Sequence, residues 1–232
     1  MTGITTIGFD ADDTLWHCEQ VFKDTQEWLV ELLAEYVEGG HLAERLLEAE
    51  RRNINHYGYG AKSFTFSMME TAMDVTADRV PASVLRKIME AGRDMLTHPV
   101  ELLPEVEKTV KGLSLDYKIV LITKGDLFDQ ERKLAQSGLG DYFDAVEIVS
   151  EKDTQTYRTV FARHGDGAAR AVMVGNSLKS DIVPAIEAGS WAIHVPHDVE
   201  WELEYAEAPT GSDRFRTAET LSGAAEFIRS LS

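Results

Sequence analysis

Short apolar runs alternate with segments of helical periodicity from residue 117 onward, and this alternation limits the possible folds more than any other feature. The apolar runs are YKIVLIT (117–123), AVEIV (145–149), RAVMVG (170–175) and WAIHV (191–195), and residues 3–9 form another near the start. Helices are expected at about 105–113, 126–137, 155–164 and 181–188. Such alternation is typical of parallel sheets with helices on both faces. We therefore predict an α/β fold with a Rossmann-like parallel sheet.

A long helical segment interrupts this pattern after the first strand. Apolar residues recur at spacings of three or four from Val21 to Tyr36 and from Val84 to Leu96, with a further cluster of leucines between them at 42, 46 and 47. We expect residues 1–16 and 100–232 to form the core domain. Residues 17–99 are expected to form a mostly helical cap domain that acts as a lid.

Composition excludes several classes of protein. The formal net charge is -17, and no cluster of Lys and Arg suits a phosphate backbone, so a nucleic-acid partner is not expected. The single cysteine, Cys18, cannot form an intramolecular disulfide and fits a reducing cytoplasm. No apolar run approaches the roughly 20 residues that span a bilayer, so no membrane association is expected. We expect a soluble, cytoplasmic monomer or homodimer.

Polar residues follow four of the predicted strands at the point where each strand ends, in the segments IGFD, VLITKGD, EIVSEKD and VMVGNSLKSD. Ligands bind at the carboxyl ends of the strands in parallel α/β sheets. The segment DADDT places Asp10, Asp12 and Asp13 within four positions. Two carboxylates about 4 Å apart repel by roughly 4 kcal/mol at an effective dielectric constant near 20. A surface turn without chemistry is one explanation, and a site for Mg²⁺, which prefers oxygen ligands, is the other.

These four segments, in this order, resemble the motifs of the haloacid dehalogenase superfamily. The resemblance is to phosphatase-like members with a helical C1-type cap after the first motif, and it covers nearly the whole chain. It implies that Asp10 is the nucleophile and forms an aspartyl phosphate. It also implies that Asp12 protonates the leaving alcohol and later activates water. Asp13 stands where relatives often have Gly, and we expect it to cap a turn or helix.

The second and third motifs are expected to hold the phosphate. The resemblance assigns Thr123 to the phosphoryl oxygens, with Lys124 and Gly125 beside it; an exposed role for Lys124 is the alternative. Many relatives carry a Lys-Pro pair at a spacing that falls on Gln155 here, which is a departure from the family pattern. We assign the neutralising lysine to Lys152, which is three residues earlier and closely follows the strand EIVS; an ordinary surface lysine is the alternative.

The fourth motif, GNSLKSD, is expected to complete a Mg²⁺ site. Relatives carry Gly-Asp followed by another acid, and Asn176 replaces the commoner Asp here. The resemblance makes the Asp10 carboxylate and the Asp12 backbone carbonyl two of the metal ligands. Either Asn176 or Asp181 would be the third. Ser177 is expected to cap the following helix.

Other residues have two interpretations each. Trp16 and His17 follow the first motif and could face the cleft or pack at a hinge. The stretch YGYGAKSFTF (57–66) could be a loop that touches substrate or part of the cap core. His194 and His197 lack a metal-binding spacing and are expected to be structural.

The predicted function is a Mg²⁺-dependent phosphatase that hydrolyses a small phosphorylated metabolite. A phosphomutase would share all four motifs. A 2-haloacid dehalogenase would share Asp10 but needs neither a leaving-group acid nor a metal, so Asp12 counts against it. A binding protein on a catalytically retired scaffold is the remaining alternative, because Asn176 and the displaced lysine depart from the family pattern.

Overall fold

The structure, a computed structural model, describes residues 3–37 and 39–231. The chain divides into two compact units. The first contains the residues up to Glu19 and those from Val100 onward, and the second is Gln20–Pro99. Each unit has its own hydrophobic core. Within the described residues, no helix combines the length and the apolar character needed to cross a membrane.

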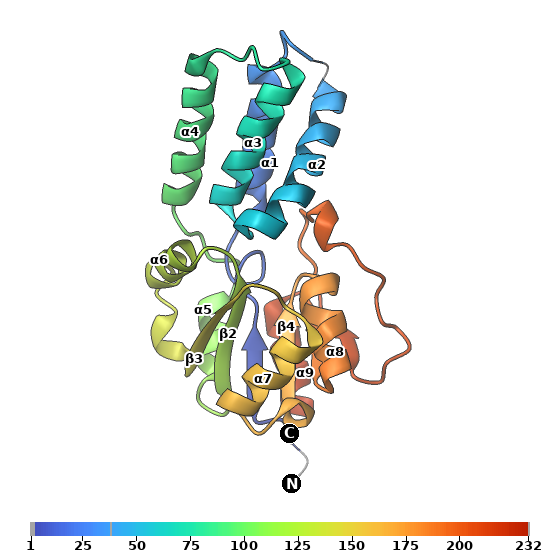
Figure 1. Cartoon of the computed structure of the whole chain (residues 1–232). Helices are drawn as coiled ribbons and strands as arrows, with labels where there is room; N and C mark the ends of the chain where they lie inside the picture. The colour runs from blue at the N-terminus through green and yellow to red at the C-terminus, as the bar shows by residue number, and fades with distance from the viewer. Residues whose placement is uncertain (1–2, 38, 232) are drawn as a thin grey trace. The chain divides into compact units, whose positions relative to one another are not determined.

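The first unit is built on a six-stranded sheet in the order β3-β2-β1-β4-β5-β6, with all neighbouring strands parallel (Figure 1). The strands are β1 (Thr6–Phe9), β2 (Lys118–Lys124), β3 (Ala145–Val149), β4 (Ala171–Gly175), β5 (Trp191–His194) and β6 (Phe215–Thr217). This is the strand order of the Rossmann fold. The predicted α/β fold with a parallel sheet and a helical insertion is confirmed. The edge strand β6 was not predicted.

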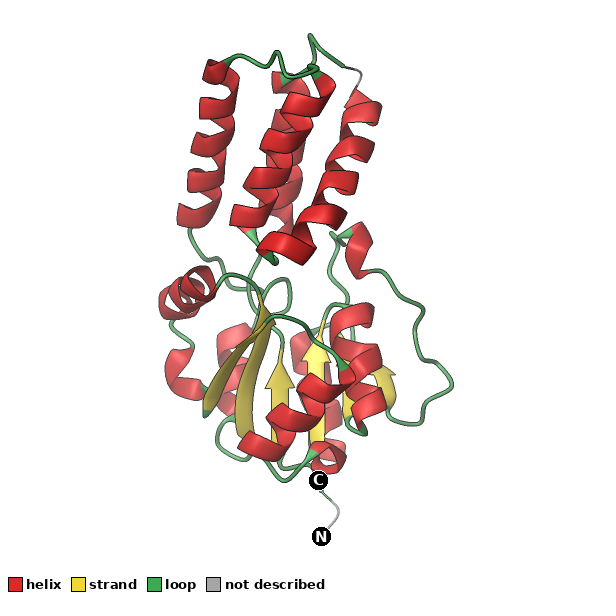
Figure 2. Ribbon diagram, viewed as in Figure 1, coloured by secondary structure: helices red, strands yellow, loops and turns green. Residues whose placement is uncertain are grey.

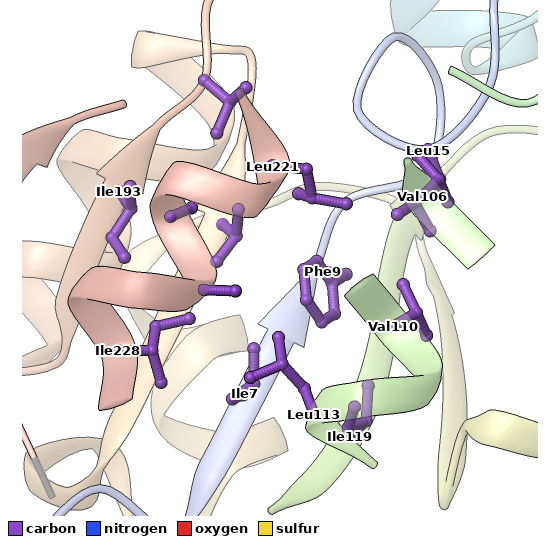
Figure 3. Close-up of a cluster of buried hydrophobic side chains, with 14 of the residues drawn as sticks. Ile7, Phe9, Leu15, Val106, Val110, Leu113, Ile119, Ile193, Leu221 and Ile228 are labelled. Carbon is purple, nitrogen blue, oxygen red and sulfur yellow. The ribbon is translucent and has the colours of Figure 1, made fainter. Parts of the chain in front are cut away.

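Helices cover both faces of this sheet, because successive side chains of a buried strand point to opposite faces. On one face, Ile7 and Phe9 of β1 pack with α5 (Val106–Leu113) and α9 (Leu221–Ser230), as Figure 3 shows. On the other face, α7 (Thr154–His164) and α8 (Val183–Ala188) pack over β2 and β4. Gly8 lies on this second face, where a Cβ atom would stand 3.1 Å from Cε1 of Phe161 in α7. The glycine thus lets α7 approach the sheet closely.

The remaining elements of the first unit are short or lie beside the site. They are α6 (Leu127–Ser137), single turns of 3₁₀ helix at Gly140–Tyr142, Ala168–Arg170 and Glu202–Glu204, and a π-helical turn at Leu178–Ile182. The helices predicted at about 105–113, 126–137 and 155–164 are present within one residue at each end. The helix predicted at 181–188 instead begins as the π-helical turn and continues as α8.

The second unit consists of helices joined by short connections (Figure 2). These helices are α1 (Glu19–Leu32), which begins at the end of the first unit, α2 (Gly39–Tyr57), α3 (Ala61–Val75) and α4 (Ala82–Thr97). Leu29, Leu46 and Ile88 are fully or almost fully buried in its core. The stretch 57–66 contributes to this core through Phe64, which is buried. The Tyr57 and Phe66 rings are exposed and contact each other, with 4.8 Å between their centroids.

Candidate active site

The strand order brings the predicted motifs to one edge of the sheet. The strands β2 and β3 lie on one side of β1, and β4, β5 and β6 lie on the other. The strand order therefore reverses between β1 and β4, and ligands bind at such a switch point in parallel α/β sheets. Phe9 pairs with Leu121 of β2 and with Val174 of β4. The Asp10 amide extends this pairing and donates to the Val174 carbonyl at 2.9 Å. Asp10 therefore begins the loop at the centre of this edge.

A buried lysine lies between two buried carboxylates at this edge. The Lys152 ammonium donates to Asp10 Oδ1 and, at 2.7 Å, to Asp181 Oδ1. The three residues are at most 6% exposed. A buried ion pair is tolerated only when its charges are matched and hydrogen-bonded. The structure thus brings together three residues that lie far apart in the sequence, including the lysine chosen against the usual family spacing.

Charge and burial shift the ionisation of this group. Burial raises the pKa of Asp10 to about 7, with the Asp181 carboxylate adding to the rise and Lys152 opposing it. Burial disfavours the Lys152 ammonium, but the Asp10 and Asp181 carboxylates outweigh that effect and raise its pKa above the ordinary value. Lys152 is therefore a permanent cation within this site.

Asp181 is fixed by several neighbours. Its Oδ2 atom accepts from the Ser177 amide at 3.0 Å, and the Tyr157 hydroxyl lies 3.4 Å from Oδ1. Gly175 is required for this arrangement, because a Cβ atom there would lie 2.3 Å from Asp181 Oδ2. Ser177 caps the π-helical turn, since its Oγ accepts from the Ser180 amide at 2.9 Å, in agreement with the capping role expected for it. Tyr157 was missed, because nothing in the sequence separates it from an ordinary core aromatic.

Thr14 links the first and fourth motifs. Its hydroxyl lies 3.0 Å from Asp10 Oδ2 and 3.2 Å from Asn176 Oδ1, and it accepts from the Asn176 amide at 3.1 Å. One hydroxyl hydrogen cannot fully satisfy two acceptor oxygens. The Asp10 and Asn176 oxygens therefore keep acceptor capacity at this point.

Asp12 is held by donors from two parts of the chain. Lys133 Nζ contacts its two carboxylate oxygens at 2.7 and 2.9 Å. Trp16 Nε1 donates to Oδ1 at 2.6 Å, and Gln130 Nε2 donates to Oδ2 at 3.1 Å. Burial alone would raise the pKa of Asp12, but the Lys133 ammonium and these hydrogen bonds lower it below the ordinary value. Gln130 and Lys133 were missed by sequence reasoning, although both lie on the helix that directly follows the second motif.

Thr123 and Lys124 of the second motif contact different groups of side chains. Thr123 is buried, and its hydroxyl accepts from Gln130 Nε2 at 2.6 Å. Lys124 instead donates to Ser180 Oγ and to Glu204, both at 2.8 Å. Its side chain is 11% exposed, so the alternative that Lys124 is an exposed lysine is wrong. Its ammonium contacts Ser180 and Glu204, whereas the Lys152 ammonium contacts Asp10. Gly125 has a φ of 135°, a backbone conformation that favours glycine.

Asp13 and the neighbouring histidines have structural contacts. The Asp13 carboxylate accepts from the amides of Cys18 and Glu19 at 2.8 and 2.9 Å, where α1 begins, so it caps the helix as the sequence predicts. His197 Nε2 lies 3.6 Å from Asp13, and its ring packs edge-on against His17. The pKa of the Cys18 thiol lies well above its ordinary value because of burial, which does not suit a thiolate nucleophile.

The donor atoms of the site fit Mg²⁺. In the part of the chain that the structure describes, no group of three or more His, Cys, Asp or Glu side chains could hold a metal ion. The predicted set needs no such group, because it uses carboxylate, amide and backbone carbonyl oxygens. Mg²⁺ takes few protein carboxylates and keeps several waters. The acceptor capacity that Asp10 and Asn176 share around Thr14 suits such an ion.

The family model of haloacid dehalogenase-like hydrolases matches residues 4–189, which is most of the chain. The chain belongs to this family. A haloacid dehalogenase-like family hydrolase from Xanthomonas campestris superimposes with a TM-score of 0.89 at 41% sequence identity, over 99% of this chain and 92% of that one. The predicted family and its hydrolase class are thereby confirmed.

Two more distant relatives of this chain belong to different classes of enzyme, a phosphatase and a dehalogenase. Glyceraldehyde 3-phosphate phosphatase from Methanothermobacter thermautotrophicus is 32% identical over 111 residues, and the match spans 45% of this chain and about half (49%) of that relative. The 2-haloacid dehalogenase from Pseudomonas syringae pv. Tomato superimposes with a TM-score of 0.63 at 23% identity, over 99% of this chain and 100% of that one. The second likeness shows the fold alone.

Proposed function

We propose that this hydrolase is a Mg²⁺-dependent phosphatase that acts on a small phosphorylated metabolite through an aspartyl phosphate on Asp10. The observation that carries the proposal is the Lys152 ammonium buried between the Asp10 and Asp181 carboxylates. A fixed cation beside the nucleophile stabilises the negative charge of a transferring phosphoryl group. The likeness of half of the chain to a glyceraldehyde 3-phosphate phosphatase supports the same reaction class.

The first half-reaction transfers the phosphoryl group to the protein. An Asp10 carboxylate oxygen attacks phosphorus, the bond between phosphorus and the ester oxygen breaks, and the departing oxygen takes a proton from Asp12. Lys133 favours the ionised form of Asp12. The negative charge of an incoming phosphate counteracts Lys133, since a nearby anion raises the pKa of a carboxyl group. Substrate binding therefore favours uptake of the proton that Asp12 must donate.

The second half-reaction releases phosphate. A water molecule attacks the phosphorus of the aspartyl phosphate, Asp12 accepts its proton, and the bond between phosphorus and Asp10 breaks. The low pKa of Asp12 suits it to return to the carboxylate form when phosphate leaves. Thr123 and the backbone amides near Gly125 are assigned to the phosphoryl oxygens.

Mg²⁺ would be held by the Asp10 carboxylate, the Asp12 backbone carbonyl and the Asn176 amide oxygen, and would neutralise charge on the phosphate. Asn176 is favoured over Asp181 as the direct ligand because each Asp181 oxygen accepts from a donor of its own, Lys152 or the Ser177 amide. Asp10 Oδ2 and Asn176 Oδ1 instead share the single hydrogen of the Thr14 hydroxyl. Asp181 would then act through Lys152, as its counter-ion.

The test is hydrolysis of an aryl phosphate by the purified protein. We expect release of phosphate that requires Mg²⁺, is lost in excess chelator and is abolished by Asp10→Asn. Asp141→Asn, at an exposed position, is the matched control and should keep full activity. Equal turnover with chelator present, or release of halide from a 2-haloacid in place of phosphate, would contradict the proposal. A panel of phosphorylated metabolites that includes glyceraldehyde 3-phosphate would then define the substrate.

A further inference from the structure

Two side chains of α6, Gln130 and Lys133, approach the Asp12 carboxylate on one side of the site. They lie three residues apart, a spacing that places both on the same face of a helix. The helix begins where the second motif ends, with Asp126 accepting from the Asp129 amide at 3.1 Å as its cap. The position of this pair is therefore set by the end of β2.

The contacts of the pair fix the carboxylate in a defined plane. Lys133 Nζ spans both oxygens of Asp12 at 2.7 and 2.9 Å, and Gln130 Nε2 adds a bond of 3.1 Å to Oδ2. Trp16, four residues after Asp12, donates from Nε1 to Oδ1 at 2.6 Å. Side-chain donors on both oxygens leave the carboxylate little freedom to rotate.

Gln130 also joins this carboxylate to the predicted phosphate site. Its Nε2 atom lies 2.6 Å from Thr123 Oγ1 and 2.8 Å from the Lys124 carbonyl, so its two hydrogens are shared among these two oxygens and Asp12 Oδ2. The opposite orientation of the amide would place an oxygen against the Asp12 carboxylate and the Lys124 carbonyl, which would repel it. The Gln130 Oε1 atom is buried with no hydrogen-bond partner among the described residues. A buried polar atom without a partner costs free energy, and the acceptors around Nε2 hold the amide in this orientation despite that cost.

We propose that Gln130 and Lys133 are positioning residues that aim the Asp12 carboxylate at the leaving-group oxygen of the substrate. The inference rests on the proposed phosphatase function. Neither side chain transfers a proton or contacts phosphorus. The pair acts through Asp12. Gln130 contacts both Asp12 and Thr123, so it fixes the distance between the proton donor, Asp12, and the phosphate that Thr123 binds.

A comparison of leaving groups tests this role. When ethyl phosphate reacts, the departing ethanol oxygen must be protonated, whereas p-nitrophenyl phosphate releases p-nitrophenolate, which is stable as an anion. The measured quantity is kcat/KM, because it reports phosphoryl transfer to the protein and is independent of the later hydrolysis that both substrates share. General acid catalysis contributes about 10²- to 10⁴-fold, so misplacement of Asp12 should reduce kcat/KM for ethyl phosphate at least tenfold more than for p-nitrophenyl phosphate.

The variants are Lys133→Met and Gln130→Met, which remove the donors and keep side chains of similar length. Lys108→Met, at a lysine whose side chain is 87% exposed, is the matched control and should leave both values unchanged. If one of the two variants does not fold by circular dichroism, the other tests the same claim. Equal losses on the two substrates would overturn the inference and leave the phosphatase proposal intact. Absence of Mg²⁺-dependent phosphate release by the wild-type protein would overturn both.

Discussion

Replacement of Lys152 by alanine is the perturbation whose effect follows most directly from the structure. The side chain is 3% exposed and is the counter-ion of both Asp10 and Asp181. Removal of one positioned donor to a developing negative charge typically lowers kcat by about 10²- to 10³-fold, or roughly 3–4 kcal/mol. We expect Lys152→Ala to lower kcat by at least this factor, because the variant also leaves the nucleophile without its nearest cation.

The same substitution should destabilise the protein when Mg²⁺ is absent. Removal of one partner from a buried ion pair costs about 3–5 kcal/mol, and here two buried carboxylates lose their shared cation. Protonation of Asp10 would offset part of this, since burial already raises its pKa to about 7. A loss of about 2–4 kcal/mol in the free energy of unfolding at pH 8 is therefore expected.

The assay compares Lys152→Ala with Lys124→Ala under identical conditions. Lys124 is also a largely buried lysine, but it pairs with Glu204, so its removal should lower kcat by less than about tenfold. Steady-state kinetics with saturating Mg²⁺ give kcat, and urea unfolding gives the stability. Comparable losses of kcat in the two variants, or a larger loss in Lys124→Ala, would refute the assignment of the catalytic lysine.

Two further predictions concern pH. Burial raises the pKa of Glu50 in the second unit from 4.5 to about 7, so the folded state binds the proton more tightly and stability falls as pH rises through this range. The loss of unfolding free energy is at most about 3 kcal/mol and nearer 1–2 kcal/mol after allowance for partial exposure. Glu50→Gln should therefore stabilise the protein against urea by that amount at pH 8 and by little at pH 4.5. Equal effects at the two pH values would contradict this prediction. The raised pKa of Asp10 likewise predicts that Mg²⁺ affinity, measured by calorimetry, falls by up to about tenfold per pH unit below pH 7. A flat profile would contradict this prediction.

The alternation of apolar and helical segments was sufficient to predict the sheet and its helices, because buried parallel strands leave continuous apolar runs. The strand β6, with the sequence FRT, was missed because its three residues are half exposed or exposed. The π-helical turn at Leu178–Ile182 also escaped prediction. Asp181 in this turn contacts Lys152 from a distant segment, and periodicity does not reveal such contacts.

The positions of the site residues were predicted where a strand end fixes them. Asp10 and Lys152 follow strands, so the sheet brings them to one edge. The contacts of Lys133 and Gln130 with Asp12 depend on the direction in which α6 leaves β2, which is a tertiary property. The pairing of Lys124 with Glu204 likewise joins residues 80 positions apart, and no local pattern indicates it.

The most direct measurement of the proposed chemistry is the capture of the covalent intermediate. The protein would be mixed with substrate and Mg²⁺, quenched within a single turnover, treated with borohydride and analysed by mass spectrometry of its peptides. Borohydride reduces an acyl phosphate to an alcohol, so homoserine is expected at position 10 and at no other aspartate. Release of phosphate in the same samples with Asp10 unmodified, or reduction at another carboxylate, would show that Asp10 is not the residue that accepts the phosphoryl group.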